Sequence, residues 1–227
     1  RFHADYLKTY LERDVRTILN VGDLYGFQRF LQLLATRAAQ LLNYSELARD
    51  ASMAPNTVKS WISVLNASGV VALVPPYHEN LGKRMIKSPK VVFTDSGLLL
   101  HLLRLGSHEA LWEMPLIGQI WENFVLSELI KTLPEHSGQG LFHYRDSNGV
   151  ELDALVIRGD EVFAVEAKSS ERPDERKLNF HKVMPLLEKK GYRTHSIVAA
   201  PIPQGRSEWA SLTIVNPGQS RLINGAR

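Results

Sequence analysis

The chain has 227 residues, of which 44% are hydrophobic and 22% charged, the composition of an ordinary soluble globular protein. It contains no cysteine, which excludes disulfides and thiolate metal sites, so that any metal requires oxygen or nitrogen ligands. No apolar run reaches the roughly 18–20 residues of a membrane span, and no signal peptide opens the chain. We therefore expect a cytoplasmic protein that makes no membrane contact.

The net charge of +3 is unevenly distributed. Residues 1–105 hold 13 Lys and Arg against 8 Asp and Glu, whereas residues 106–227 hold 14 against 16. A basic front half before a slightly acidic back half fits nucleic-acid docking followed by a carboxylate-rich site, although such a balance is also common without that role. We expect two parts, residues 1–105 and 106–227. Because the chain starts at Arg1 in a helical pattern, we also expect a fragment of a longer protein.

The front part reads as helices followed by a pair of strands. Apolar residues recur at helical spacing up to Leu42, with turn residues at 20–23, which predicts two helices. Ser45 is a candidate cap for a short helix, residues 51–55 break it, and a second helix begins near Asn56. Strands are predicted at 70–74 and 90–94. Two short helices, a strand pair and a basic loop between the strands make a winged-helix-like region.

Such a region predicts a DNA contact. The second helix of a helix-turn-helix enters the major groove, and loop cations meet phosphate. The alternative is that this region is a protein–protein adaptor with a solvated basic loop. The expected DNA-binding residues are Asn56, Thr57, Lys59, Lys83, Arg84 and Lys87.

The back part has a mixed α/β pattern. A short helix at 97–104 and a link at 106–115 precede it. The predicted order is then a helix at 117–133, strands at 141–144, 150–157 and 161–167, a helix at 174–190 and a strand at 194–200.

The strands at 150–157 and 161–167 carry the most informative pattern. Alternate residues of a strand share a face, so Glu166 and Lys168 point the same way, as do Glu151 and Asp153. The short link between the strands predicts a hairpin that brings Asp153 close to Glu166. Buried carboxylates need compensation, and a divalent cation such as Mg²⁺ or Mn²⁺ supplies it. Lys168 would orient or deprotonate the attacking water, or neutralise charge on a phosphoryl group.

Glu122 is the fourth candidate. On the helix at 117–133 it lies on the same apolar side as Gly118, Val125, Leu126 and Leu129. A carboxylate in such surroundings needs a group that compensates its charge. The metal site is a candidate partner.

This order of elements resembles the PD-(D/E)XK nuclease superfamily over roughly residues 116–200. The resemblance implies a restriction-endonuclease-like α/β/α fold with a central mixed sheet, metal ligands at Asp153 and Glu166, a catalytic Lys168, and Glu122 in support as a further ligand. Leu152 stands before Asp153 where the motif has proline. Resolvase-like members are usually dimers, so an oligomer is compatible with the resemblance.

The whole chain is similar to the C-terminal region of bacterial and archaeal AAA-type ATPases, catalogued as a domain of unknown function. The segments at 6–15 and 88–98, the Glu122 helix and the Asp153–Glu166 hairpin carry this similarity. It implies an ATPase domain upstream as a partner. No Walker A motif occurs in the chain, so we expect no ATP binding here.

Three interpretations of the carboxylates remain open from the sequence. The first is a Mg²⁺- or Mn²⁺-dependent DNA endonuclease. The second is an inactive nuclease-like and winged-helix module that binds DNA or a protein and regulates the ATPase. The third is a set of ordinary ion pairs, with Lys168 pairing Glu166 or Asp153.

Overall fold

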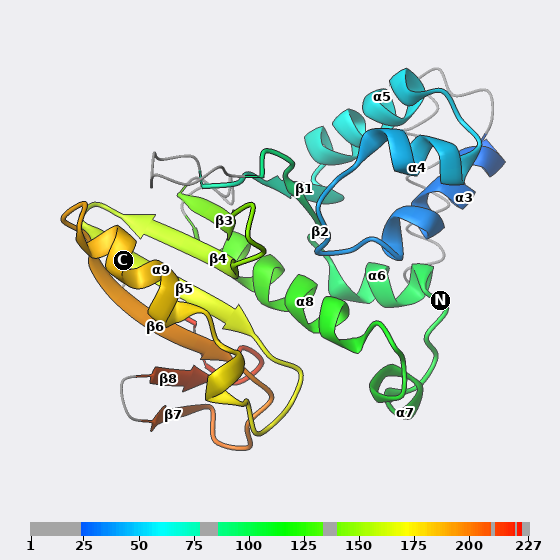
Figure 1. Ribbon diagram of the computed structural model, residues 1–227. Coiled ribbons are helices and arrows are strands. Elements are labelled where there is room, and N and C mark those ends of the chain that lie inside the picture. Colours follow the sequence, from blue (N-terminus) through cyan, green and yellow to red (C-terminus); the bar gives the residue numbers. More distant parts are fainter. Residues whose placement is uncertain (1–23, 78–85, 134–139, 210–211, 221, 224–227) are drawn as a thin grey trace.

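Figure 1 shows the computed structural model of the protein, which describes residues 24–77, 86–133, 140–209, 212–220 and 222–223. The two helices predicted before residue 42 fall partly outside these ranges. The second is observed as α3 (Leu24–Ala35), and residues 1–23 lie outside the described part.

Two short helices follow α3, as the sequence predicts. They are α4 (Tyr44–Ala51) and α5 (Pro55–Ala67). The cap of α4 is Asn43, not Ser45, because the Asn43 side chain accepts a hydrogen bond from the backbone N–H of Glu46. Ser52 adopts a left-handed conformation with φ of 55°, which turns the chain sharply, and Pro55 starts α5 with its φ already suited to a helix.

The predicted strand pair is also present. Strands β1 (Val71–Val74) and β2 (Lys90–Phe93) pair antiparallel, from Val71 opposite Phe93 to Val74 opposite Lys90. Helices α3, α4 and α5 pack with these strands and with α6 (Ser96–Leu102) in one apolar cluster. Phe27 and Phe30 meet Trp61 edge to face in this cluster, so Trp61 is a core residue.

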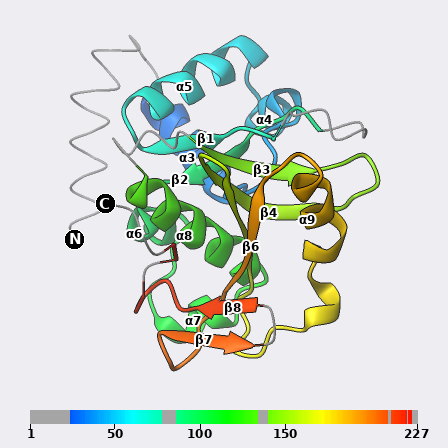
Figure 2. The ribbon, with the colours of Figure 1, turned by 90° about the vertical axis from the view of Figure 1, so that its left-hand side faces the viewer.

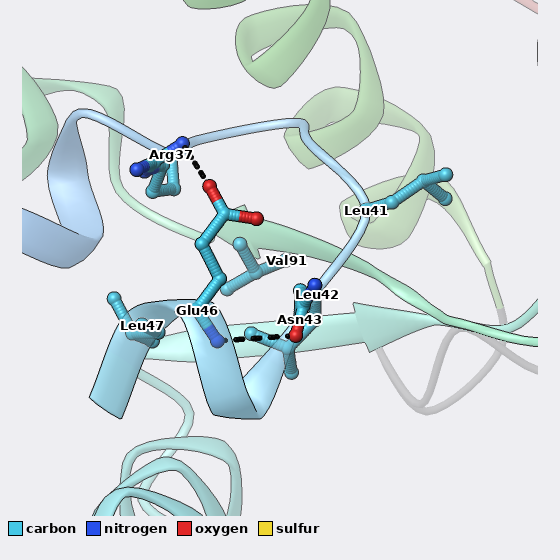
Figure 3. A pocket seen from close by; sticks show the side chains of 7 residues that line it. All are labelled: Arg37, Leu41, Leu42, Asn43, Glu46, Leu47 and Val91. Atoms are coloured by element: carbon cyan, nitrogen blue, oxygen red, sulfur yellow. Dashed lines mark hydrogen bonds and ion pairs between the residues drawn. The ribbon is translucent and has the colours of Figure 1, made fainter. Parts of the chain in front are cut away.

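A small cavity lies between α4 and β2. Its volume is about 20 Å³, which is room for about one water molecule. Figure 3 shows Arg37 reaching across it to Glu46, with the two atoms of this ion pair 3.1 Å apart. Arg37 also pairs with Asp50 at 2.6 Å, so ion pairs fix the wall of the cavity. The cavity itself is too small for an organic ligand.

The back part contains a six-stranded mixed sheet in the order β3-β4-β5-β6-β8-β7. The strands β3 to β6 match the predicted ones, and β7 and β8 are additional. The bounds are β3 (Leu141–Arg145), β4 (Glu151–Arg158), β5 (Glu161–Ala167), β6 (Arg193–Ala199), β7 (Arg206–Trp209) and β8 (Leu212–Val215). Pairs β3–β4, β4–β5 and β7–β8 are antiparallel, and β5–β6 and β6–β8 are parallel. The predicted mixed α/β class is therefore confirmed.

Helices pack against this sheet in two separate apolar clusters. One contains residues of α8 (Ile117–Thr132), such as Leu126, together with Val156 and Val165. The other contains residues of α9 (Phe180–Glu188), such as Val183, together with Leu155 and Val162. Figures 1 and 2 show α8 and α9 separated by the sheet. Alternate residues of β5 join different clusters, as a strand covered on both faces requires.

Two predicted segments differ in detail. The helix expected at 174–190 is split into a 3₁₀ turn, η3 (Glu175–Lys177), and α9, because Leu178 has an extended backbone and ends the turn. The link expected at 106–115 contains a short helix, α7 (His108–Trp112).

Hydrogen bonds join the front and back parts. Both stems of the loop between β1 and β2 contact β3: Tyr77 N–H donates to the His143 carbonyl at 2.8 Å, and Ile86 N–H donates to the Arg145 carbonyl at 3.1 Å. The buried Asn123 side chain of α8 accepts from Phe93 N–H at 2.8 Å and donates to Phe93 carbonyl at 3.0 Å. The strand pair is therefore fixed against both α8 and the edge of the sheet.

Candidate functional site

The hairpin of β4 and β5 positions two acidic side chains. The two strands are antiparallel and Ala154 lies opposite Val165. Asp153, the residue before Ala154, is therefore next to Glu166, the residue after Val165. Asp153 is 9% exposed and Glu166 only 3%. Asp153 Oδ2 accepts a hydrogen bond from Ala167 N–H at 2.8 Å, which fixes its orientation. Burial and the charge of Asp153 raise the pKa of Glu166, as expected for neighbouring carboxylates.

Lys168 pairs with Glu166. The Lys168 ammonium lies 2.8 Å from Glu166 Oε2, and the backbone N–H of Asn179 donates to Glu166 Oε1 at 3.2 Å. Burial lowers the pKa of Lys168, but the charges of Glu166 and Asp153 outweigh it and raise the pKa. Lys168 therefore stays protonated and serves as the counter-ion of Glu166.

A second lysine occupies the centre of the acidic group. Lys90, the first residue of β2, is 1% exposed. Its Nζ atom lies 2.5 Å from Glu122 Oε1, 2.9 Å from Glu151 Oε1 and 3.7 Å from Asp153 Oδ1. Lys90 comes from the front part of the chain, whereas the three carboxylates come from α8 and β4. We call these four residues the Lys90 cluster.

The electrostatics of the Lys90 cluster follow from its burial. Desolvation alone would lower the pKa of Lys90, but the three carboxylates raise it above its usual range. Desolvation and the charge of Asp153 raise the pKa of Glu122 to about 8, against the attraction of Lys90. Desolvation opposes ionisation of Glu151, yet Lys90 and Arg145 lower the pKa of this residue. The ammonium thus stays charged, and Glu122 is the group that titrates near neutral pH.

His143 borders the Lys90 cluster as a neutral, structural residue. It is fully buried, and its Nε2 lies 3.0 Å from the Ser88 carbonyl, an acceptor, so that Nε2 carries the ring proton. Burial and the charge of Lys90 lower the pKa of His143 to about 4. His143 therefore holds the segment leading into β2 in place.

The carboxylates by themselves have a spacing that suits a cation. Oxygen atoms of Glu122, Glu151 and Asp153 lie within 4.8 Å of one another. The space among them is occupied by the Lys90 ammonium, however. A divalent ion at about 2.1 Å from the same oxygens would lie beside a positive charge buried in low dielectric. With the Lys90 ammonium among them, these three carboxylates as arranged do not fit a metal ion.

Of the four residues that the sequence predicts as a site, Glu122 and Asp153 lie in one group of carboxylates with Glu151, whereas Glu166 lies outside that group and pairs with Lys168. Asp153 interacts electrostatically with both Glu122 and Glu166, and Lys168 interacts with Glu122 and Asp153. Sequence reasoning missed Lys90 and left Glu151 out of the ligand set. The sequence does contain an indication of this role. Lys90 precedes the apolar run Val91–Phe93, and a lysine buried with such a run needs an oppositely charged partner, as Glu122 does.

The predicted DNA-binding residues lie in two segments, α5 and the stretch of chain between β1 and β2 that leads to Lys90. Asn56 and Lys59 are exposed on α5 and Thr57 is half-buried there. Lys87 is exposed in the segment before β2, and Lys83 and Arg84 lie outside the described residues.

Replacing Lys90 by methionine tests the role of the buried ammonium. The Lys90→Met variant keeps side-chain length but leaves Glu122, Glu151 and Asp153 without their central cation. Breaking a buried ion pair in this way costs about 3–5 kcal/mol of unfolding free energy. We expect that loss in urea denaturation at pH 8, and a smaller loss at pH 5, where protonation removes carboxylate charge. Lys87→Met, at an exposed neighbour, should leave stability nearly unchanged.

A pH series tests the raised pKa of Glu122. The folded protein holds the Glu122 proton up to about pH 8, whereas the unfolded chain releases it near 4.5. The folded state thus binds more protons between these values, so Glu122 makes stability fall as pH rises from about 4.5 to 8. Glu122→Gln should flatten this decline in urea denaturation. Glu128→Gln on the same helix is the control, and equal slopes in the two variants would contradict the assignment.

The models of two domains of unknown function match separate parts of the chain. Residues 1–109 match the Domain of unknown function DUF8612, and residues 117–199 match the Domain of unknown function DUF4143. DUF4143 is associated with C-terminal regions of AAA-type ATPases, so the back part is similar to an ATPase-associated domain. This agrees with the resemblance to ATPase C-terminal regions predicted from the sequence.

Two curated relatives are similar to most of this chain. The uncharacterized proteins Mb2031c of Mycobacterium bovis and Rv2008c of Mycobacterium tuberculosis are each 32% identical over 168 residues. The match covers 74% of this chain but 37% of each relative, so the chain corresponds to little more than a third of those proteins. Among the described residues, no helix is long and apolar enough to cross a membrane.

A solved structure from Thermococcus gammatolerans is a weak match. It is a half-complex from a tetradecameric assembly of McrB AAA+ hexamers with bound McrC. The identity is 14% and the TM-score 0.28, over 82% of this chain and 46% of that chain.

Proposed function

We propose that this chain is a nuclease-like module that does not cleave DNA. It binds DNA and belongs to a protein with an AAA-type ATPase domain. Its back part is a restriction-endonuclease-like domain, and its front part is a winged-helix-like region. The single observation that carries the proposal is the position of Lys90 among Glu122, Glu151 and Asp153.

The nuclease-like architecture is supported by the arrangement of the hairpin. Asp153 and Glu166 lie on neighbouring antiparallel strands, Lys168 follows Glu166 on the same side, and α8 supplies Glu122. This is the arrangement implied by the PD-(D/E)XK resemblance. The mixed sheet with α8 and α9 packed on it is consistent with an α/β/α sandwich.

The absence of cleavage follows from how the charges are compensated. In a Mg²⁺-dependent nuclease the carboxylates hold the ion, and the ion activates water. Here Lys90 and Lys168 both form ion pairs with the carboxylates that would be ligands. Lys90 is buried and its ammonium is held by three groups, so its withdrawal would leave an uncompensated acidic cluster. Lys90 thus compensates the charge of the carboxylates, as a metal ion would, but it does not activate water.

The DNA contact is supported by the exposed side of α5. Val58, Trp61 and Ile62 are buried, and the neighbouring positions Asn56, Lys59 and Ser60 are exposed. Exposed amide, ammonium and hydroxyl groups on the second helix of a helix-turn-helix are suited to base edges and phosphates.

The ATPase partnership is supported by the DUF4143 match and by the length of the relatives. Relatives that extend well beyond the matched region have room for a further domain. In this proposal the module supplies DNA contact and the ATPase domain supplies the energy of nucleotide hydrolysis.

Calorimetric titration with Mn²⁺ tests whether Lys90 replaces a metal. We expect no site-specific binding to the wild-type chain, and no metal-dependent cleavage of linear or branched DNA. Lys90→Met should acquire Mn²⁺ binding, because three carboxylates within 4.8 Å are then left without a cation. The added substitution Asp153→Ala should abolish the acquired binding.

The wild-type result decides this proposal even if Lys90→Met fails to fold. Mn²⁺ binding by the wild type that vanishes in Asp153→Ala, together with DNA cleavage, would establish an active nuclease instead. Lys90→Arg is the matched control, since it keeps the positive charge and should bind no Mn²⁺.

A charge reversal on α5 tests the DNA contact. Lys59→Glu removes one cation from the exposed side of the helix and should weaken binding to duplex DNA about fivefold at low salt. Fluorescence anisotropy with a labelled duplex measures this change. Lys189→Glu makes the same charge change at an exposed position at the end of α9 and should have little effect. Equal losses in the two variants would mean that only the net charge matters.

A further inference from the structure

Helix α7 stands apart from the apolar clusters that hold the other helices. It spans His108–Trp112, is capped by the Ser107 side chain, and contains no buried residue. Figure 1 shows α7 beyond the start of α8, separate from the helices of the front part. Short isolated helices are marginal in water, so the side chains of α7 must be held in another way.

A row of aromatic contacts holds α7 in place. Trp112 Nε1–H donates to His108 Nε2 at 2.8 Å, and the Trp112 and Trp121 rings lie 6.5 Å apart between centroids. Trp121 in turn packs on Phe124 and donates its indole N–H to the Ala199 carbonyl at 2.9 Å. The Trp112 ring is therefore fixed on the sheet through Trp121.

Trp112 is nonetheless 38% exposed. Among the described residues, Tyr25 and Trp112 are the two large hydrophobic side chains that are exposed. Its fixed orientation means that a partner can stack on it with little loss of side-chain entropy. Exposed tryptophans held in this way are typical of interaction surfaces.

The charges around Trp112 are acidic. Glu109 lies one helical turn before Trp112 and Glu113 follows it directly, both exposed. Neither carboxylate forms an ion pair with a described residue. Hydrogen bonds from its own backbone N–H and from Ser107 lower the pKa of Glu109, which therefore stays ionised. An anionic nucleic-acid strand would be repelled by this surface.

We propose that Trp112 and Glu109 form a docking site for an arginine side chain of a partner protein. A guanidinium plane stacks on an indole ring and donates two parallel N–H groups to a carboxylate. Lysine lacks the plane and the paired donors, so the site distinguishes the two cations. This surface is distinct from the Lys90 cluster and from the exposed side of α5, and it adds a protein partner to the proposed DNA contact.

The test uses the peptide acetyl-Gly-Arg-Gly-Arg-Gly-amide as a probe. Indole N–H signals of the tryptophans are followed by ¹H–¹⁵N NMR, with the Trp112 signal assigned by its loss in Trp112→Phe. We expect a saturable shift of the Trp112 signal, and binding about fivefold weaker for the same peptide with lysine. Glu109→Gln should weaken the arginine peptide, whereas Glu171→Gln, at another exposed glutamate, should not.

Several outcomes would overturn the proposal. They are a Trp112 signal that does not move with millimolar peptide, equal binding of the arginine and lysine peptides, and equal effects of Glu109→Gln and Glu171→Gln. None of these results bears on Mn²⁺ binding or on the effect of Lys59→Glu, so the site fails or stands independently of the proposed function.

Discussion

The architecture depends on one buried ammonium group. Lys90 enters the acidic centre from β2, and the carboxylates that receive it belong to α8 and β4. A lysine with 1% exposure is costly to bury, and this cost is offset only when the strand pair sits against α8 and the sheet in one orientation. The same contact that neutralises the carboxylates therefore fixes the front part of the chain on the back part.

Three consecutive residues of α8 show how this orientation is specified. Trp121 donates to the Ala199 carbonyl of β6, Glu122 pairs with Lys90, and Asn123 makes two hydrogen bonds to the backbone of Phe93. Apolar packing alone would tolerate a shift of β2 along the helix. The amide of Asn123 tolerates none, since a shift would leave a fully buried polar side chain unsatisfied. Polar contacts thus supply the register and apolar contacts the bulk of the burial.

The sequence predicted those parts of the site that follow from local geometry. Strand alternation and a short link were enough to bring Asp153 and Glu166 together, and helical spacing identified Glu122 as a carboxylate in an apolar stripe. Lys90 was not predicted as a partner because it is 32 residues from Glu122, and their contact arises only from packing between the two parts. The strand β7 (Arg206–Trp209) and the helix α7 (His108–Trp112) were missed because they lack the continuous apolar run by which the equally short β1 was predicted, and the strand β8 was missed with its partner β7. The break between η3 and α9 reflects tertiary contacts, since Asn179 donates its backbone N–H to Glu166 and its side chain to the Glu151 carbonyl.

Under the proposed function, the position of Lys90 is what separates the nuclease-like pattern of this chain from catalysis. Asp153, Glu166 and Lys168 have the residue types and the spacing of a metal site, and nothing in their own strands distinguishes an active site from a structural one. The difference lies in the residue that compensates their charge. A metal ion leaves coordination positions at which water is activated, whereas the Lys90 ammonium compensates the same charge without activating water. In that proposal, the chemistry of the acidic centre depends on Lys90 of β2, an element outside the segment that resembles the nuclease motif.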